Sequence, residues 1–338
     1  MPEGAAITKG TSNASKMKLR LLSAGDVRAA IDMSAAIEAM RSAFSQLSAG
    51  SAIVPLRGWL STPGGTTLLM PAFLGESDGL GMKIVSGFEG NAQRGLPTIN
   101  ALVVMLDADT GEPRAVIEGT YLTALRTAAG SGLATELLAE PDASVLAVFG
   151  AGAQARSHIE AMRAVRPVRE IRIASRTRDS AERLARELEG IDIRVCDDPA
   201  TAADGAELIV TATTSRKPVF PAAALAEGAH INAVGTFSHE GCEIEGEVVL
   251  RSRLVVDSRE AVLREAGDVH IRIAEGLFGP DHIDAELGEI VNGARPEGRM
   301  GHEFTLFKSV GNAAQDVAAA AEILRVAELE GLGTTVEL

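Results

Sequence analysis

A glycine turn near the middle of the chain carries the clearest chemical signal. Gly150, Gly152 and Ala155 form a G-x-G-x-x-A turn directly after the apolar run SVLAVF. The first glycine permits a tight turn, the second lets a pyrophosphate approach the backbone, and the small third residue lets the next helix pack closely. A helix that begins near Ala153 would offer its free backbone N–H groups to the phosphates. We therefore predict a dinucleotide site here.

The end of the next expected strand indicates which dinucleotide binds. NAD sites usually carry an acid there that bonds the ribose 2′-hydroxyl, whereas an arginine suits a 2′-phosphate. This chain has Ser175, Arg176 and Thr177 in that region, and the first acid is Asp179 in the following expected helix. The pattern favours NADPH and leaves NADH use open. Further cofactor-binding residues are predicted at the start of the helix and at later strand ends: Gln154, Thr211, Ala212, Thr213, Val234 and Gly235.

Alternating strands and helices must hold this turn, and the second half of the chain supplies them. The runs EIRIASR, DIRVC, ELIVTATT, HINAVG and RLVVDS are separated by helical segments, which predicts a parallel sheet with helices on both faces. Short apolar runs between about Pro55 and Val116 predict a sheet-rich part with a hairpin bend at Gly111. Helices are expected from Leu19 to Gly50, after Gly119, and over the C-terminal run LFKSVGNAAQDVAAAAEILRVAELEG.

Composition excludes several classes of function. The net charge of the 338 residues is −14 and no basic run interrupts it, so a nucleic-acid partner is not expected. The longest apolar runs are too short to span a membrane. Cys196 and Cys242 have no disulfide or metal-ligand spacing, and we expect no metal. The polar first 16 residues are expected to be a disordered tail without a targeting signal, which favours the cytoplasm.

Several segments, in order, resemble one family. LTALRTAAGSGLA, VFGAGAQARSHIEA, IVTATTSRKPVF, HINAVG, FTLFKSVGNAAQDVAAA and GLPTINALVVMLDADTGEP together are similar to the ornithine cyclodeaminase and mu-crystallin family. The resemblance implies an α/β fold with a tail (1–16), a Rossmann domain (126–304) and a sheet-rich α+β domain for substrate binding and dimerisation (17–125 plus 305–338). It also implies a homodimer that interconverts imino and amino acids with a nicotinamide cofactor.

The same resemblance implies a substrate site. Arg57 in IVPLRGW and Arg126 in LTALRTAA match arginines that bind the substrate carboxylate, and Lys83 in GMKIVSG matches a lysine at the carboxylate and reacting carbon. Thr98 and Met70 are expected to line this pocket. The residue chemistry agrees, because two guanidinium groups can fix one carboxylate, and burial can lower the pKa of a lysine enough for proton exchange near neutrality.

One position departs from the pattern of the cyclodeaminases. Phe237 stands where they carry a proton-transferring aspartate, while Glu243 and Ile244 keep the surrounding register. A phenylalanine cannot act as a base, but it can pack against an apolar ring. We therefore expect a reductase of a cyclic 2-imino acid, Δ1-pyrroline-2-carboxylate to L-proline or Δ1-piperideine-2-carboxylate to L-pipecolate.

Alternatives remain open at this stage. The same family pattern also allows a cyclodeaminase that uses another base, or an alanine dehydrogenase-like enzyme. A non-catalytic NADP(H)-binding protein is a reading of another class, because a Rossmann fold can hold a ligand without turning it over. The proton donor of the reductase is also open, with Lys83, a water beside it, or His239 as candidates.

Overall fold

The first of two β-sheets is built mainly from the N-terminal third of the chain. The computed structural model describes residues 17–338 apart from 78, 189 and 237. In spatial order the strands are β16 (Thr334–Glu337), β1 (Lys18–Leu22), β7 (Pro113–Glu118), β6 (Ile99–Leu106), β5 (Gly79–Gly87), β4 (Gly65–Leu74) and β2 (Ala52–Ile53), with β3 (Gly58–Thr62) paired to β4. Strands β4 to β7 run antiparallel to their neighbours in sequence, and Gly111, with φ +75°, lies in the connection between β6 and β7. The expected sheet-rich part and its bend are confirmed.

One face of this sheet carries the C-terminal helix α11 (Ala313–Glu330), which packs on β4, β5 and β6. The close approach depends on two glycines of β5. A Cβ at Gly79 would lie 2.9 Å from Val317 Cγ1, and one at Gly81 would lie 3.4 Å from Val317 Cγ2. Because side chains alternate along a strand, Lys83 shares this inward face with both glycines.

The second sheet is fully parallel, as expected. Its strands lie in the order β10 (Asp192–Val195), β9 (Glu170–Ala174), β8 (Val145–Phe149), β11 (Leu208–Thr211), β12 (His230–Ala233), β15 (Phe304–Lys308), β13 (Ser252–Val256) and β14 (Ile283–Glu286). Alternate residues of β8 enter different cores, Leu146 and Val148 on one face and Ala147 and Phe149 on the other. Both faces are therefore covered, which confirms the α/β class.

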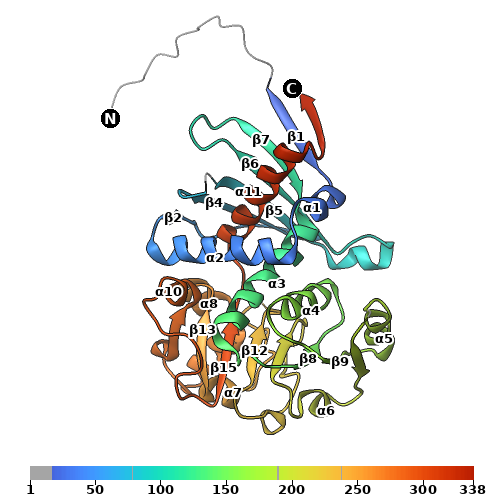
Figure 1. Ribbon diagram of the computed structural model, residues 1–338, viewed down its shortest axis with the longest axis vertical. Helices are drawn as coiled ribbons and strands as arrows, with labels where there is room; N and C mark the ends of the chain where they lie inside the picture. Colours follow the sequence, from blue (N-terminus) through green and yellow to red (C-terminus); the bar gives the residue numbers. More distant parts are fainter. Residues whose placement is uncertain (1–16, 78, 189, 237) are drawn as a thin grey trace, which may run out of the picture.

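The remaining helices connect and cover the two sheets (Figure 1). They are α1 (Ala24–Ala30), α2 (Met33–Ala49), α3 (Gly119–Leu138), α4 (Ala153–Val165), α5 (Arg178–Arg186), α6 (Pro199–Ala203), α7 (Gly246–Arg251), α8 (Arg259–Glu265), α9 (Gly267–Ala274) and α10 (Leu287–Val291). Short 3₁₀ helices are η1 (Glu89–Arg94), η2 (Ala222–Ala224) and η3 (Pro280–His282). Helix α3 contacts α2, α4, α11 and strands of both sheets, so it joins the two halves.

Two expected helices begin later than the sequence pattern predicts. The segment from Leu19 starts with strand β1, and the C-terminal helix starts at Ala313 after strand β15. The run FTLFK is buried throughout between β12 and β13, a position that favours β-branched and aromatic residues. Gly311 then turns the chain with φ +75°, and Asn312 caps α11 in a capping box with Gln315.

The expected domain boundaries fall inside continuous elements. The division at residues 125/126 lies within α3, and the division at 304/305 lies within β15 of the second sheet. The chain belongs to the second sheet up to Lys308 and returns to the first half only after that residue. The division into two separate domains stays a prediction. Among the described residues no helix is long and apolar enough to cross a membrane, and no cluster of His, Cys, Asp or Glu side chains could hold a metal ion.

Candidate active site

Lys83 is a buried cation on the inward face of β5. Its side chain is 2 % exposed, and its Nζ lies 2.8 Å from the carboxylate of Asp316 in the first turn of α11. Burial lowers the pKa of Lys83 to about 7; the charge of Arg126 acts in the same direction, and Asp316 opposes it. Met70, the cross-strand neighbour of Lys83 on β4, is also buried. The structure therefore brings two of the expected pocket residues together.

Arg126 projects from the middle of α3 to the same carboxylate. Its Nε donates to Asp316 Oδ1 at 2.9 Å, and its Nη1 donates to Gln315 Oε1 at 3.0 Å. Asp316 is fully buried, so one aspartate fixes both cations. Sequence reasoning missed Asp316, although a charged residue inside the apolar run GNAAQDVAAAA signals a buried partner, because lone buried charges are costly.

Arg57 approaches from the segment between β2 and β3. Its Nη2 donates to the backbone carbonyls of Gly311 and Val310 and lies 3.3 Å from Glu265 Oε2 at the end of α8. Arg126 lies against the other side of Gly311, where a Cβ would be 2.8 Å from Arg126 Nη1. Arg57, Gly311 and Arg126 are therefore contiguous.

The segment that carries Gly311 is held by a second buried acid. Asp257, directly after β13, accepts hydrogen bonds from Ser309 Oγ, Val310 N and Gly311 N at 2.7–3.0 Å. Burial raises the pKa of Asp257, and these hydrogen bonds oppose that shift. The chain thus presents fixed carbonyls to Arg57 as it passes from the second sheet to α11.

The arrangement suits an anionic ligand. Three cations, Arg57, Lys83 and Arg126, pair with two carboxylates, Asp316 and Glu265, in a region largely withdrawn from water, and the buried Asp257 acts electrostatically on Arg57 from nearby. A carboxylate placed there gains charge-assisted hydrogen bonds.

Two expected pocket residues are not placed in this cluster. Thr98 is exposed before β6, and its carbonyl accepts a hydrogen bond from Phe88 N at 2.8 Å. Phe237 lies outside the described residues.

A cleft of about 670 Å³ opens at the carboxyl ends of β8, β9 and β11, where ligands of parallel α/β sheets bind. Gly150 has φ +114°, and a Cβ there would lie 2.5 Å from the carbonyl oxygen of Ala212. The space around Gly152 is open, with nothing within 4 Å of a Cβ position, so a pyrophosphate has room. The sequence-predicted residues on the wall of this cleft are Gly150, Gly152, Ser175, Arg176, Thr177, Ala212 and Thr213.

The other expected cofactor residues lie at the same edge of the sheet. Ala153, Gln154 and Ala155 form the first turn of α4, where Ala155 is fully buried and Gln154 Oε1 is a buried atom without a partner among the described residues. Thr211, Val234 and Gly235 lie at or after the ends of β11 and β12. The open glycine turn before α4 fits a bound dinucleotide.

Glu243 fixes two of these strand ends and was noted in the sequence only for its register. Fully buried, it accepts hydrogen bonds from Thr213 N and Oγ1 at 2.7 Å and from Gly235 N at 2.8 Å. Burial raises the pKa of Glu243, and the charge of Lys308 opposes this. Lys308 itself lies 2.8 Å from Asp268.

Two neighbouring arginines at the cleft differ in their contacts. Arg178 pairs with Asp197 and, at 2.8 Å, with Glu182. Arg176 is exposed on the cleft wall, and no residue in the described part of the chain forms an ion pair or hydrogen bond with it. Its guanidinium is therefore available to an anion.

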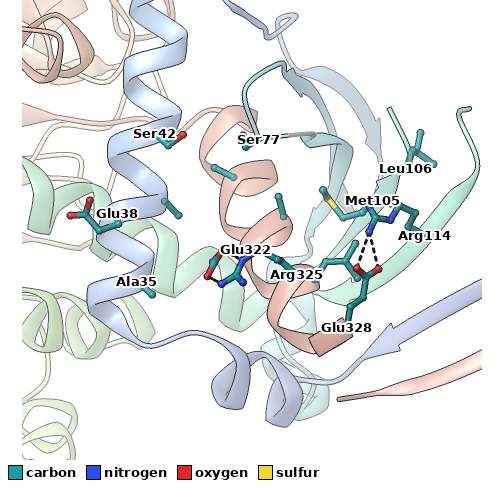
Figure 2. A pocket seen from close by; sticks show the side chains of 14 residues that line it. Ala35, Glu38, Ser42, Ser77, Met105, Leu106, Arg114, Glu322, Arg325 and Glu328 are labelled. Carbon is teal, nitrogen blue, oxygen red and sulfur yellow. Dashed lines mark hydrogen bonds and ion pairs between the residues drawn. The ribbon is translucent and has the colours of Figure 1, made fainter. Parts of the chain in front are cut away.

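Another cavity, of about 610 Å³, lies between α2, α11 and the first sheet (Figure 2). Its arginines are already neutralised, Arg114 by Glu328 at 2.8 Å and Arg325 by Glu322 at 2.6 Å. This cavity is therefore a poorer site for a carboxylate than the cluster around Lys83.

Known proteins are similar to this chain over most of its length. The Δ1-pyrroline-2-carboxylate reductase of Bacillus cereus is 38% identical over 323 residues, which cover 94% of this chain and 99% of the relative. Mouse ketimine reductase mu-crystallin is 40% identical over 252 residues, 75% of this chain and 77% of that protein.

Solved structures show the same fold over nearly the whole chain. The Thermococcus litoralis Δ1-pyrroline-2-carboxylate reductase in complex with NADH and L-proline has a TM-score of 0.89 at 38% identity, covering 94% of this chain and 100% of that one. An archaeal alanine dehydrogenase dimer with bound NAD has a TM-score of 0.90 at 32% identity, over 95% and 100% of the two chains. The model of the ornithine cyclodeaminase/mu-crystallin family matches residues 17–328, and the chain belongs to this family.

Proposed function

We propose that the protein is a nicotinamide-dependent reductase that converts Δ1-pyrroline-2-carboxylate to L-proline, with Δ1-piperideine-2-carboxylate to L-pipecolate as a second reaction. This proposal rests mainly on the cluster of Arg57, Lys83 and Arg126. Lys83 and Arg126 share the buried carboxylate of Asp316. The relatives named as pyrroline-2-carboxylate and ketimine reductases support the substrate class.

The residues of this chain bind and orient the substrate. Arg57, Lys83 and Arg126 hold its carboxylate, and the pairing of Lys83 and Arg126 with Asp316 keeps both cations in place. Fixing one end of a small planar imine sets the direction of its C=N bond. Such orientation of the reacting groups can lower the activation barrier of the reaction considerably. The bound nicotinamide supplies the hydride. Met70, buried beside Lys83, offers apolar surface to the ring, whereas a pocket role for Thr98 and Phe237 stays a prediction from the sequence.

NADPH is the proposed cofactor. The guanidinium of Arg176 lies at the cleft and pairs with no described residue, which supports this, because it can bond a 2′-phosphate bidentately. The related structures carry NADH or NAD, so NADH remains a usable alternative. The proposed cofactor contacts are those described at the ends of β8, β9, β11 and β12.

We also propose a homodimer formed through the outer face of the first sheet. Large apolar side chains are exposed there, and contiguous apolar surface marks interaction sites. They are Ile53, Leu60, Leu69 and Leu102, whose pairing puts them on the face opposite Lys83. The related alanine dehydrogenase is described as a dimer. A place in cytoplasmic proline metabolism is consistent with the free, buried thiols of Cys196 and Cys242.

One assay tests the function. Oxidation of NADPH and of NADH is followed by absorbance with Δ1-pyrroline-2-carboxylate, Δ1-piperideine-2-carboxylate, iminosuccinate, and pyruvate with ammonia. We expect turnover with the cyclic imines. Release of ammonia from ornithine, or a preference for pyruvate with ammonia, would instead indicate a cyclodeaminase or an alanine dehydrogenase. No rate with any imine would indicate a binding protein.

A further inference from the structure

A small cavity beside Arg57 is bordered by buried polar atoms that have no hydrogen-bond partner among the described residues. The cavity, of about 130 Å³, lies between the two halves of the molecule and is bordered by Arg57, Met70, Glu265 and Asn312. Among the described residues, Glu265 Oε2 and Asn312 Nδ2 are buried and have no hydrogen-bond partner. Asn312 is 8 % exposed. A buried acceptor and a buried donor that both lack a hydrogen bond, next to a cation, indicate a polar ligand.

The spacing of Arg57 and Glu265 matches the two polar groups of a 2-imino acid. Glu265 Oε2 lies 3.3 Å from Arg57 Nη2 in a contact that is an ion pair without hydrogen-bond geometry. In a 2-imino acid the nitrogen and the carboxylate are bonded to the same carbon, so one carboxylate oxygen and the nitrogen lie a similar short distance apart. A site for such a molecule therefore needs a cation for the carboxylate next to a carboxyl group for the nitrogen, and Arg57 and Glu265 are such a pair.

We infer that Glu265 is the acid that protonates the imine nitrogen, in place of the aspartate that cyclodeaminases carry at position 237. This inference rests on the proposed function. Hydride adds to the imine carbon, and the π pair of the C=N bond moves to nitrogen. The O–H bond of the Glu265 carboxyl breaks as the new N–H bond forms. Glu265 is left as a carboxylate beside Arg57 and regains its proton from solvent.

The surroundings of Glu265 help it to carry a proton. Burial raises its pKa and the charge of Asp257 adds to this, while Arg57, the exposed His239 and Arg264 act in the opposite direction. A substrate carboxylate bound to Arg57 offsets that cation and adds a negative charge nearby, which favours the protonated carboxyl further. His239 packs edge-on against His270 with ring centroids 4.8 Å apart. Lys83, by contrast, already donates to Asp316.

The test compares Glu265→Gln with wild-type protein in Δ1-pyrroline-2-carboxylate reduction across pH. We expect kcat to fall by about 100-fold or more, the usual contribution of general acid catalysis, with KM and NADPH affinity little changed. In wild-type protein kcat falls at high pH as the acid is lost, and Glu265→Gln lacks this limb. Glu265→Ala should regain rate when acetate is added. Glu247→Gln, which breaks an exposed pair with Arg251, is the matched control and should behave as wild type.

Each other result overturns the inference. A raised KM with unchanged kcat would make Glu265 a positioning residue for Arg57. A high-pH limb that persists in Glu265→Gln would assign the proton to another group. If Glu265→Gln fails to bind NADPH, Glu265→Ala is tested in its place. If Glu265→Ala binds NADPH but acetate does not restore its rate, Glu265 is not the proton donor. A wild-type protein inactive on every cyclic imine would refute the proposed function itself, whereas full activity of Glu265→Gln would refute only the role of Glu265.

Discussion

Lys83 and Asp316 are separated by 233 positions in the chain, yet their side chains form a 2.8 Å hydrogen bond in the core. Strand β5 brings the lysine and helix α11 brings the aspartate, and Gly79 and Gly81 allow the helix to lie close to the strand. Arg126 shares the same carboxylate. The proposed substrate site is thus held by contacts between β5, α11 and α3.

Asp316→Ala should destabilise the protein, because it leaves Lys83 and Arg126 buried without a counter-charge. Breaking a buried ion pair by removing one partner costs about 3–5 kcal/mol. Denaturant unfolding measures this loss. Glu328→Ala, which removes the exposed partner of Arg114, is the control and should cost no more than about 1 kcal/mol. Equal stability of the two variants would show that Asp316 does not neutralise the cluster.

Lys83→Ala and Arg126→Ala should each lower kcat/KM for the cyclic imine by about two orders of magnitude, because the carboxylate loses a charge-assisted contact and its fixed orientation. Both residues lie away from the glycine turn, so NADPH affinity should be retained. Arg325→Ala serves as a control, since Arg325 already pairs with Glu322. Wild-type rates in either variant would show that the substrate binds elsewhere.

The pKa of Lys83 predicts a pH effect on substrate capture. Burial lowers it to about 7, so the ammonium is present below about pH 7 and is lost as pH rises through that value. Where the ammonium anchors the substrate, kcat/KM should fall about tenfold per pH unit above this point. Lys83→Arg keeps the charge throughout this range. It should therefore flatten the decline in kcat/KM, while the fall of kcat at high pH should remain. An unchanged kcat/KM profile would show that the ammonium of Lys83 does not anchor the substrate.

Arg176→Ala should weaken NADPH binding by roughly tenfold, the value of a charge-assisted contact at an exposed site, and should leave NADH binding unaffected. Titration of both cofactors by fluorescence measures the difference. Arg178→Ala is the matched control, because Arg178 already pairs with Glu182 and Asp197. Equal loss of both cofactors in Arg176→Ala would argue against a 2′-phosphate contact.

Leu60→Asp should convert a dimer to a monomer, because it puts a charge on the apolar outer face of the first sheet, where Leu60 is 59 % exposed. Sedimentation at several protein concentrations gives the mass. A charge at Leu329, which is 75 % exposed at the end of α11, should leave the mass unchanged. A wild-type monomer would contradict the proposed dimer directly.

Local patterns predicted much of the fold. The parallel sheet, the hairpin bend at Gly111 and the glycine turn at Gly150 follow from strand runs and from backbone geometry that only a few residues adopt. Strand β15 was missed because FTLFK adjoins an alanine-rich run, and burial between two strands overrides the local helical pattern.

The candidate site was only partly predictable for a similar reason. The cations Arg57, Lys83 and Arg126 are visible in short motifs, and the structure brings them together. Their counter-charges are not visible, because Asp316 and Glu265 acquire their partners through long-range packing. Glu265 lies in α8, and its neighbour Arg57 precedes β3. No spacing rule connects the two positions.

The segment from Ser309 to Asn312 carries the chain from the second sheet to α11 and is fixed by Asp257. Helix α3, the other main connection, passes the same point with Arg126. A rotation of one half of the molecule against the other would therefore have its axis close to the three cations. Distances among Arg57, Gly311 and Arg126 would therefore change little during such a rotation.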